Sequence, residues 1–127
     1  MDCADCRGEM AALELGGVEI DHCFACGGAW LDAGELELLL SGAAEKDRVL
    51  GSLGAEPASR EKKRNCPICS AKMGKVACGP DARVCVDKCA RGHGLWFDRG
   101  ELEAVLGMGR FADDRVLGLL KEIFGKK

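Results

Sequence analysis

The 127-residue sequence contains few of the side chains that enzymes use most often for acid–base work. It has two histidines, no tyrosine and only six aromatic residues, which are four phenylalanines and two tryptophans. If one histidine binds a metal, a single histidine remains as the partnering base for a serine or cysteine nucleophile. No segment has the GxxxxGK[ST] pattern of a phosphate-binding loop. These absences predict that the protein is not an enzyme, with no catalytic and no organic-cofactor-binding residues.

Long hydrophobic runs are also missing. No apolar stretch approaches the roughly 20 residues that a membrane-spanning helix needs, so no membrane contact is expected. Met1–Asp5 has neither the basic nor the apolar region of a signal peptide, and we therefore expect a cytoplasmic protein. The net charge of −3 does not favour a protein that grips nucleic acid over its whole surface.

Cysteine, in contrast, is abundant. The chain has nine cysteines, and six of them form three CxxC pairs, namely Cys3/Cys6, Cys23/Cys26 and Cys66/Cys69. An odd count without an export signal argues against a disulfide framework, whereas CxxC pairs are typical of metal-binding turns. Redox CxxC motifs belong to larger βαβ folds, which this sequence does not predict. The cysteines therefore indicate metal binding.

An internal repeat organises the chain. Residues 20–36 read IDHCFACGGAWLDAGEL and residues 86–102 read VDKCARGHGLWFDRGEL, at an offset of 66 without a gap. Upstream, Cys3 and Cys6 align with Cys66 and Cys69 at an offset of 63. The sequence is thus a tandem of one unit of about 55 residues. We divide it into a first repeat (residues 1–53), a linker (54–64) and a second repeat (65–127).

Each repeat predicts a small α+β unit in which a metal-bound hairpin is followed by one or two helices. The short apolar segments predict strands at Ala11–Leu15, Val18–Asp21, Lys75–Cys78 and Val84–Asp87. Helices are expected after the tryptophans, to about Ser41 and Leu106, and again over 45–53 and 111–124. The expected helix starts have Asp at the N-cap and Glu three residues later, in Asp32/Glu35 and Asp98/Glu101.

The spacing predicts two tetrahedral centres, each closed by four protein ligands. The first centre takes Cys3, Cys6, Cys23 and Cys26, and the second takes Cys66, Cys69, Cys89 and His93. Cys26 aligns with Gly92, but His93 is one residue further on, and three cysteines with one histidine is an accepted zinc set. An alternative second centre uses Cys85 and Cys89 as its second pair. Two structural Zn²⁺ ions are therefore expected.

The remaining candidates have simpler interpretations. Cys78 aligns with Leu15 and is expected to be buried, while Cys85 aligns with Glu19 and is expected to be more exposed. His22 aligns with Lys88 and is expected at the surface. Trp30 and Trp96 could stack on nucleic-acid bases, but we favour a core role for both.

The CxxC…CxxCGGxWLDxGELE pattern resembles the bacterial transcription-factor-IIB-type zinc-ribbon family. The second copy, with Cys89-x3-His93 followed by GLWFDRGEL, resembles the histidine variant of the same motif. The resemblance covers residues 1–41 and 64–106 and implies two tandem zinc β-ribbons. It implies no catalytic residue.

These features predict a non-enzymatic zinc-binding module that acts as a protein-interaction or transcription-associated adaptor. The alternative is nucleic-acid binding through residues 62–91, because residues 1–60 carry a net charge of −8 and residues 61–127 carry +5. The residues expected to contact phosphate are Lys62, Lys63, Arg64, Lys72, Lys75, Lys88 and Arg91. The opposite charges also permit self-association. A third alternative is electron transfer by a single iron in the four-cysteine centre.

Overall fold

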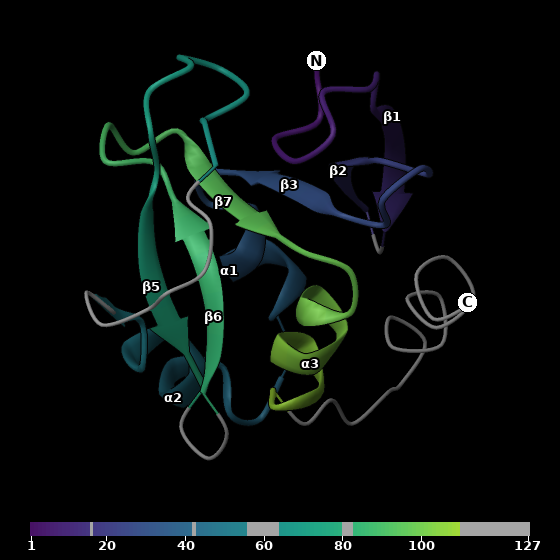
Figure 1. Cartoon of the computed structure of the whole chain (residues 1–127). Helices are drawn as coiled ribbons and strands as arrows, with labels where there is room; N and C mark the ends of the chain where they lie inside the picture. Colours follow the sequence, from purple (N-terminus) through teal and green to yellow (C-terminus); the bar gives the residue numbers. More distant parts are fainter. Residues whose placement is uncertain (16, 42, 56–63, 80–82, 110–127) are drawn as a thin grey trace.

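The computed structural model describes residues 1–15, 17–41, 43–55, 64–79 and 83–109. It is a small α+β structure built on one antiparallel sheet of seven strands in the order β1-β2-β3-β7-β6-β5-β4 (Figure 1). The strands are β1 (Ala11–Leu15), β2 (Val18–His22), β3 (Ala29–Asp32), β4 (Gly54–Ala55), β5 (Gly74–Cys78), β6 (Val84–Lys88) and β7 (Gly94–Phe97).

Each repeat contains the expected hairpin after its first CxxC pair. In the first, β1 and β2 pair from Ala11 opposite His22 to Leu15 opposite Val18. In the second, β5 and β6 pair from Gly74 opposite Lys88 to Cys78 opposite Val84. The sequence therefore located all four hairpin strands to within one residue at each end. It missed β4, because Gly54–Ala55 was expected to belong to the linker, and this segment instead pairs with β5.

The central strands β3 and β7 were not expected. The sequence led us to expect only helices after the tryptophans, but residues 29–32 and 94–97 form strands that pair with each other. Trp30 lies opposite Trp96 at the centre of this pairing, and the two strands run side by side in Figure 1. As a result the two repeats share one continuous sheet.

Within the described residues there are three short helices, α1 (Glu35–Leu39) and α2 (Lys46–Gly51) after β3, and α3 (Glu101–Gly107) after β7. The prediction that Asp32 and Asp98 are N-caps was wrong. The N-cap residues are Gly34 and Gly100, with φ of 91° and 85°, a left-handed conformation that glycine adopts without strain. The expected helix over 111–124 lies outside the described residues, and α1 and α2 are shorter than predicted.

The two faces of the sheet have different surroundings. Alternation along the strands places Leu15, Ile20, Leu31, Val86 and Phe97 on one face, which we call the inner face, and all five are buried. They belong to one apolar cluster with side chains from all three helices, Leu36 and Leu39 of α1, Val49 of α2, and Leu102, Val105 and Leu106 of α3. The opposite, outer face carries Trp30 and Trp96. No helix in the described ranges is long and apolar enough to cross a membrane.

Candidate metal centres

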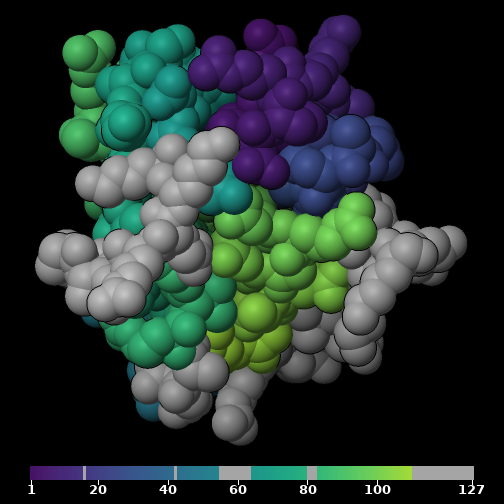
Figure 2. Space-filling model, in the orientation of Figure 1, coloured from purple at the N-terminus to yellow at the C-terminus, as the bar shows by residue number. Residues whose placement is uncertain are grey.

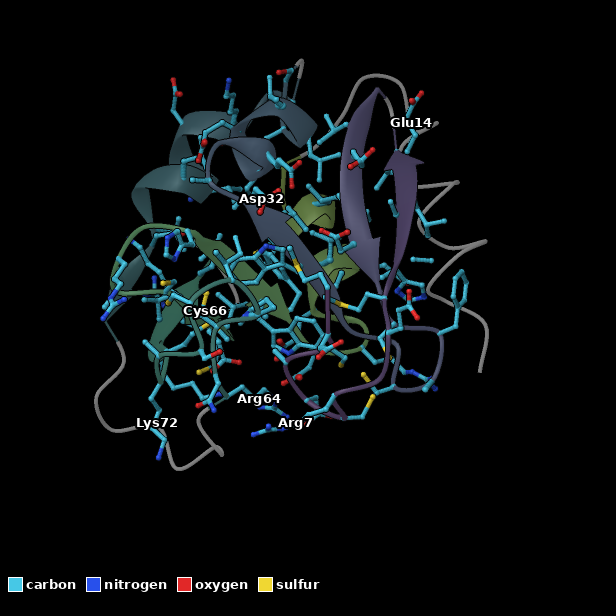
Figure 3. The ribbon with its side chains drawn as sticks, turned by 90° about the horizontal axis from the view of Figure 1, so that it is seen from above. Arg7, Glu14, Asp32, Arg64, Cys66 and Lys72 are labelled. Atoms are coloured by element: carbon cyan, nitrogen blue, oxygen red, sulfur yellow. The ribbon has the colours of Figure 1, made fainter. Side chains whose placement is uncertain are left out.

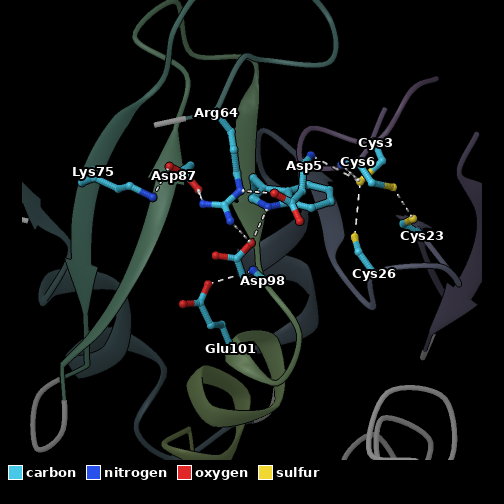
Figure 4. Close-up of polar contacts among 11 residues, drawn as sticks. Cys3, Asp5, Cys6, Cys23, Cys26, Arg64, Lys75, Asp87, Asp98 and Glu101 are labelled. Carbon is cyan, nitrogen blue, oxygen red and sulfur yellow. Dashed lines mark hydrogen bonds and ion pairs between the residues drawn. The ribbon is translucent and has the colours of Figure 1, made fainter. Parts of the chain in front are cut away.

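The first candidate centre lies at one end of the β1–β2 hairpin. The thiols of Cys3, Cys6, Cys23 and Cys26 converge there, with all four sulfurs within 4.8 Å of one another. The Sγ atoms of Cys3 and Cys26 are 3.4 Å apart and those of Cys6 and Cys23 are 3.5 Å apart (Figure 4). A tetrahedral zinc ion holds its sulfur ligands about 3.7 Å apart, so this donor set fits zinc. The separations exclude disulfides, whose sulfurs are about 2.05 Å apart.

The second candidate centre combines three thiols with one imidazole. Cys66, Cys69, Cys89 and His93 again lie within 4.8 Å of one another. The Nδ1 atom of His93 is 3.4 Å from Sγ of Cys89 and 3.9 Å from Sγ of Cys66. The structure thus brings together the same four residues that the repeat alignment selects. The alternative set is not assembled, because Cys85 lies within β6, opposite Ala77 of β5.

The turns that carry the thiols are ordered by backbone hydrogen bonds. The N–H groups of Asp5 and Cys6 both point at Sγ of Cys3, at 3.3 and 3.4 Å. The next residue, Arg7, has a φ of 65°, and its equivalent Ser70 has a φ of 63°, so both turns close in the same left-handed conformation. Donors aimed at a sulfur stabilise the thiolate, which is the form that binds metal.

One thiol of each centre is tuned toward the thiolate. Burial alone raises the pKa of Cys89, but N–H groups of His93 and Arg91 and the neighbouring thiols outweigh it and lower the pKa to about 6. In the first centre, burial is outweighed in the same way, and the backbone of Cys26 with the nearby thiols lowers the pKa of Cys23 to about 7. In each centre, therefore, one thiol loses its proton more readily than an ordinary cysteine.

Beside the two centres lie the tryptophans, both completely buried. They share one cluster with four ligand cysteines and two methionines, namely Cys3, Cys23, Cys66, Cys89, Met10 and Met73. The indole N–H of Trp30 donates to Asp32 at 2.8 Å, and that of Trp96 donates to Asp98 at 3.0 Å. This confirms the core role and explains why the two aspartates do not cap the helices.

Arg64 forms a polar bridge between the two repeats. Its guanidinium lies 3.1 Å from Asp5 in the first centre's turn and 3.3 Å from Asp98 beside Trp96 (Figure 4). Figure 3 shows Arg64 in the view from above. It also lies 3.8 Å from Asp87, a buried carboxylate of β6. Lys75 Nζ is 2.7 Å from Asp87, and both side chains of that pair are almost fully buried. Arg64 and Lys75 were expected to be available for nucleic acid, and the structure instead pairs them with carboxylates.

The buried pair gives a testable prediction. Replacing Lys75 by Met removes the nearest cation from the Asp87 carboxylate and leaves the more distant Arg64, and we expect a loss of about 3 kcal/mol in unfolding free energy at pH 7. Burial already raises the pKa of Asp87 despite Lys75 and Arg64. In the variant that pKa rises further, so the stability penalty shrinks as the pH falls and Asp87 takes up a proton.

Urea unfolding of the zinc-loaded protein at several pH values measures this effect. Lys72→Met is the matched control, because Lys72 is an exposed lysine of the same repeat. A penalty of the same size at pH 5 and pH 8 is the result that contradicts an ionised, buried Asp87.

Two further expectations can be compared with the structure. The surface position expected for His22 was wrong, since only 2% of this residue is exposed, and its Nδ1 lies 3.0 Å from the carbonyl oxygen of Gly28. Burial lowers the pKa of His22, so its neutral form is favoured. Cys78 is fully buried, as expected, and Cys85 is partly exposed.

The four-cysteine turn pair, the hairpin and the third strand together define a zinc-ribbon domain. In agreement, the model of one protein family, described as a transcription factor zinc-finger, matches residues 2–42. This part of the chain is similar to that family and contains the first centre, so the protein is a zinc-binding module. The match does not extend to the second centre, whose ligand group is consistent with a second copy. No curated protein and no solved structure matches the chain.

Proposed function

We propose that the protein is a non-enzymatic interaction module in which two structural zinc ions shape a surface for a basic protein partner. The two closed centres support the structural role. Each offers four protein ligands, which complete a tetrahedral shell and leave no position for water or substrate. Catalytic zinc sites, in contrast, keep one position open.

The observation that carries the choice of partner is the acidic outer face of the first repeat, formed by Glu14, Glu19, Asp21 and Asp32. Glu14 and Glu19 lie directly opposite each other on β1 and β2, and both are exposed. Like charges in that arrangement destabilise a sheet. The cost is offset when a cationic surface covers the face.

The carboxylates of this face are close enough to influence one another. Burial raises the pKa of Asp21, and the negative charges of Asp32 and Glu19 raise it further. A positively charged side chain placed among them relieves this repulsion. Arginine and lysine side chains of a protein partner provide such charges without needing a deep pocket.

In the second repeat, the equivalent carboxylates are paired with cations of the same chain. Asp87 aligns with Asp21 and Asp98 aligns with Asp32, and both are contacted by cations of the chain itself, Lys75 and Arg64. Two of the seven residues expected to bind phosphate are therefore engaged inside the molecule. Lys72, Lys88 and Arg91 are exposed, and Lys62 and Lys63 lie outside the described residues. This supports a protein partner over the nucleic-acid alternative.

Charge reversal tests the proposal. We expect the wild type to bind an oligo-arginine peptide with an affinity that falls with added salt. The double variant Glu14→Lys/Glu19→Lys is expected to lose this binding, and also to lose the proteins that the wild type captures from a lysate. Fluorescence anisotropy with the labelled peptide and affinity capture from a lysate measure this. Glu37→Lys/Asp47→Lys is the matched control, since both carboxylates are exposed but lie on α1 and α2.

Equal binding by both double variants contradicts the acidic face as the docking surface. Binding of a labelled RNA or DNA duplex, lost on replacing Lys72, Lys88 and Arg91 by Ala, supports the nucleic-acid alternative instead. Arg64→Ala does not serve in that experiment, because it breaks the internal bridge to Asp5 and Asp98.

A further inference from the structure

We propose that the two metal centres act as one cooperative unit, in which zinc at either centre raises the affinity of the other for zinc. This rests on the proposed function in one respect, namely that both centres bind zinc. The inference comes from contacts that cross between the repeats and end on the metal-binding turns themselves. Figure 2 shows the two CxxC segments, residues 1–10 in purple and 64–72 in teal, side by side at one end of the molecule.

The first contact between the repeats is made by the two tryptophans, each of which packs against a glycine of the other repeat. The indole of Trp96 packs on Gly28, so closely that a Cβ at Gly28 would lie 2.2 Å from its Cζ2 atom. Conversely, a Cβ at Gly94 would lie 2.8 Å from Cζ2 of Trp30. Each tryptophan thus contacts the glycine that closes the metal-binding turn of the other repeat.

These two glycines hold ligand residues in place. The carbonyl of Gly28 accepts a hydrogen bond from the N–H of Cys23 at 3.0 Å, and that of Gly94 accepts one from Cys89 at 3.1 Å. A shift of Trp96 is therefore transmitted through Gly28 to a ligand of the first centre. The reverse path runs from Trp30 through Gly94 to a ligand of the second centre.

A second pair of crossing contacts involves the residues that follow β3 and β7. Ala33 donates its N–H to the carbonyl of His93, a ligand residue of the second centre, at 2.9 Å. Arg99 is the equivalent of Ala33 in the second repeat and lies against Gly27, between Cys26 and Gly28 of the first centre. A Cβ at Gly27 would lie 2.3 Å from Nε of Arg99. Again each repeat supports the metal-binding turn of the other.

The third crossing contact is the Arg64 bridge. Arg64 lies two residues before Cys66, and its guanidinium binds Asp5, which stands between Cys3 and Cys6. The same guanidinium contacts Asp98, which accepts the indole N–H of Trp96. The bridge therefore connects both CxxC turns and the tryptophan pair in one network.

These contacts couple zinc binding at the two centres, because zinc at one centre orders residues that the turn of the other centre contacts. Without metal, the thiols of a turn lose what holds them together, so metal binding and folding of the turn are one process. Once zinc has ordered one turn, the tryptophan of that repeat and the Arg64 network already lie where they contact the turn of the other repeat. The second ion then orders less of the chain, and its binding is favoured by that difference.

Ligand substitutions measure the coupling. Cys6→Ala removes one ligand of the first centre, and Cys69→Ala removes its equivalent in the second; Cys6 is exposed and Cys69 is partly exposed. We expect each variant to bind zinc at the intact centre at least about tenfold more weakly than the wild type. Linkage requires the same factor in both directions. Competition with a chromophoric chelator, using Zn²⁺ alone as the probe, gives the affinities.

Cys85→Ala is the matched control, because it removes a cysteine that belongs to neither centre, and we expect it to leave both affinities unchanged. Intact-centre affinities equal to those of the wild type in both ligand variants overturn the proposal. A wild type that binds fewer than two zinc ions contradicts the proposed function instead, so the two failures are distinguishable.

A milder variant decides the question if the ligand variants do not fold in excess zinc. Arg64→Met keeps all eight ligands and changes the last residue of the linker, just before the second repeat, yet it breaks the bridge to Asp5. We expect alkylation of Cys6 in the presence of a chelator, followed by peptide mass spectrometry, to become several-fold faster. Arg48→Met, which removes an arginine of α2, is the control. An unchanged rate for Arg64→Met then overturns the coupling.

Discussion

Removal of zinc is expected to unfold the whole described structure rather than one repeat. Structural zinc contributes on the order of 10–16 kcal/mol in small domains, which is comparable to the entire stability of a chain of this size. Here four ligand cysteines are part of the same buried cluster as both tryptophans. A chelator should therefore abolish the far-UV circular dichroism of the sheet and expose Trp30 and Trp96 together, as a red shift of their fluorescence.

Native mass spectrometry provides the reference state for that experiment, with two zinc ions expected per chain. Colourless protein with two zinc ions agrees with structural centres, whereas red protein containing iron supports the electron-transfer alternative. Retention of the dichroism after complete metal removal contradicts the structural role of the ions.

The second large effect is expected from the tryptophan pair. Trp96→Ala should cost about 3–5 kcal/mol of unfolding free energy, because it empties the centre of the β3–β7 pairing and releases the contact with Gly28. It also leaves Asp98 without the indole N–H that it accepts. Chemical denaturation of the zinc-loaded protein measures the loss.

Phe24→Ala is the control for this substitution. Phe24 is also aromatic and adjacent to a metal ligand, but 66% of it is exposed, and its ring meets only the edge of His22 among the described aromatic pairs. We expect its replacement to change the stability by less than about 1 kcal/mol. Equal losses for the two variants are incompatible with a structural role for the tryptophan pair.

The local features of the fold could be predicted from the sequence, because each depends on a short motif. A CxxC pair brings two thiols together within four residues, and the hairpin strands are marked by alternation, as in β2, where Val18 and Ile20 are buried and Glu19 is exposed. Even the unusual ligand His93 follows from the repeat, since it lies one residue from the position aligned with Cys26.

The features that the sequence did not predict depend on contacts between the repeats. The strand β3 is only four residues long, three of them buried, so it shows no alternation to distinguish it from the start of a helix. Its pairing with β7 and the burial of His22 appear only when the chain is folded. Arg64 looked like part of a charged linker because its three carboxylate partners are distant in sequence.

The pairing of Trp30 with Trp96 has a consequence for how the two halves of the chain can change during evolution. The same residue of each copy meets at the centre, which is the arrangement of a symmetric homodimer about its two-fold axis. In a true homodimer every substitution occurs on both sides at once. Because both repeats lie in one chain, that restriction does not hold here. The first repeat has four cysteine ligands and exposed carboxylates, whereas the second has a histidine ligand and internal cations.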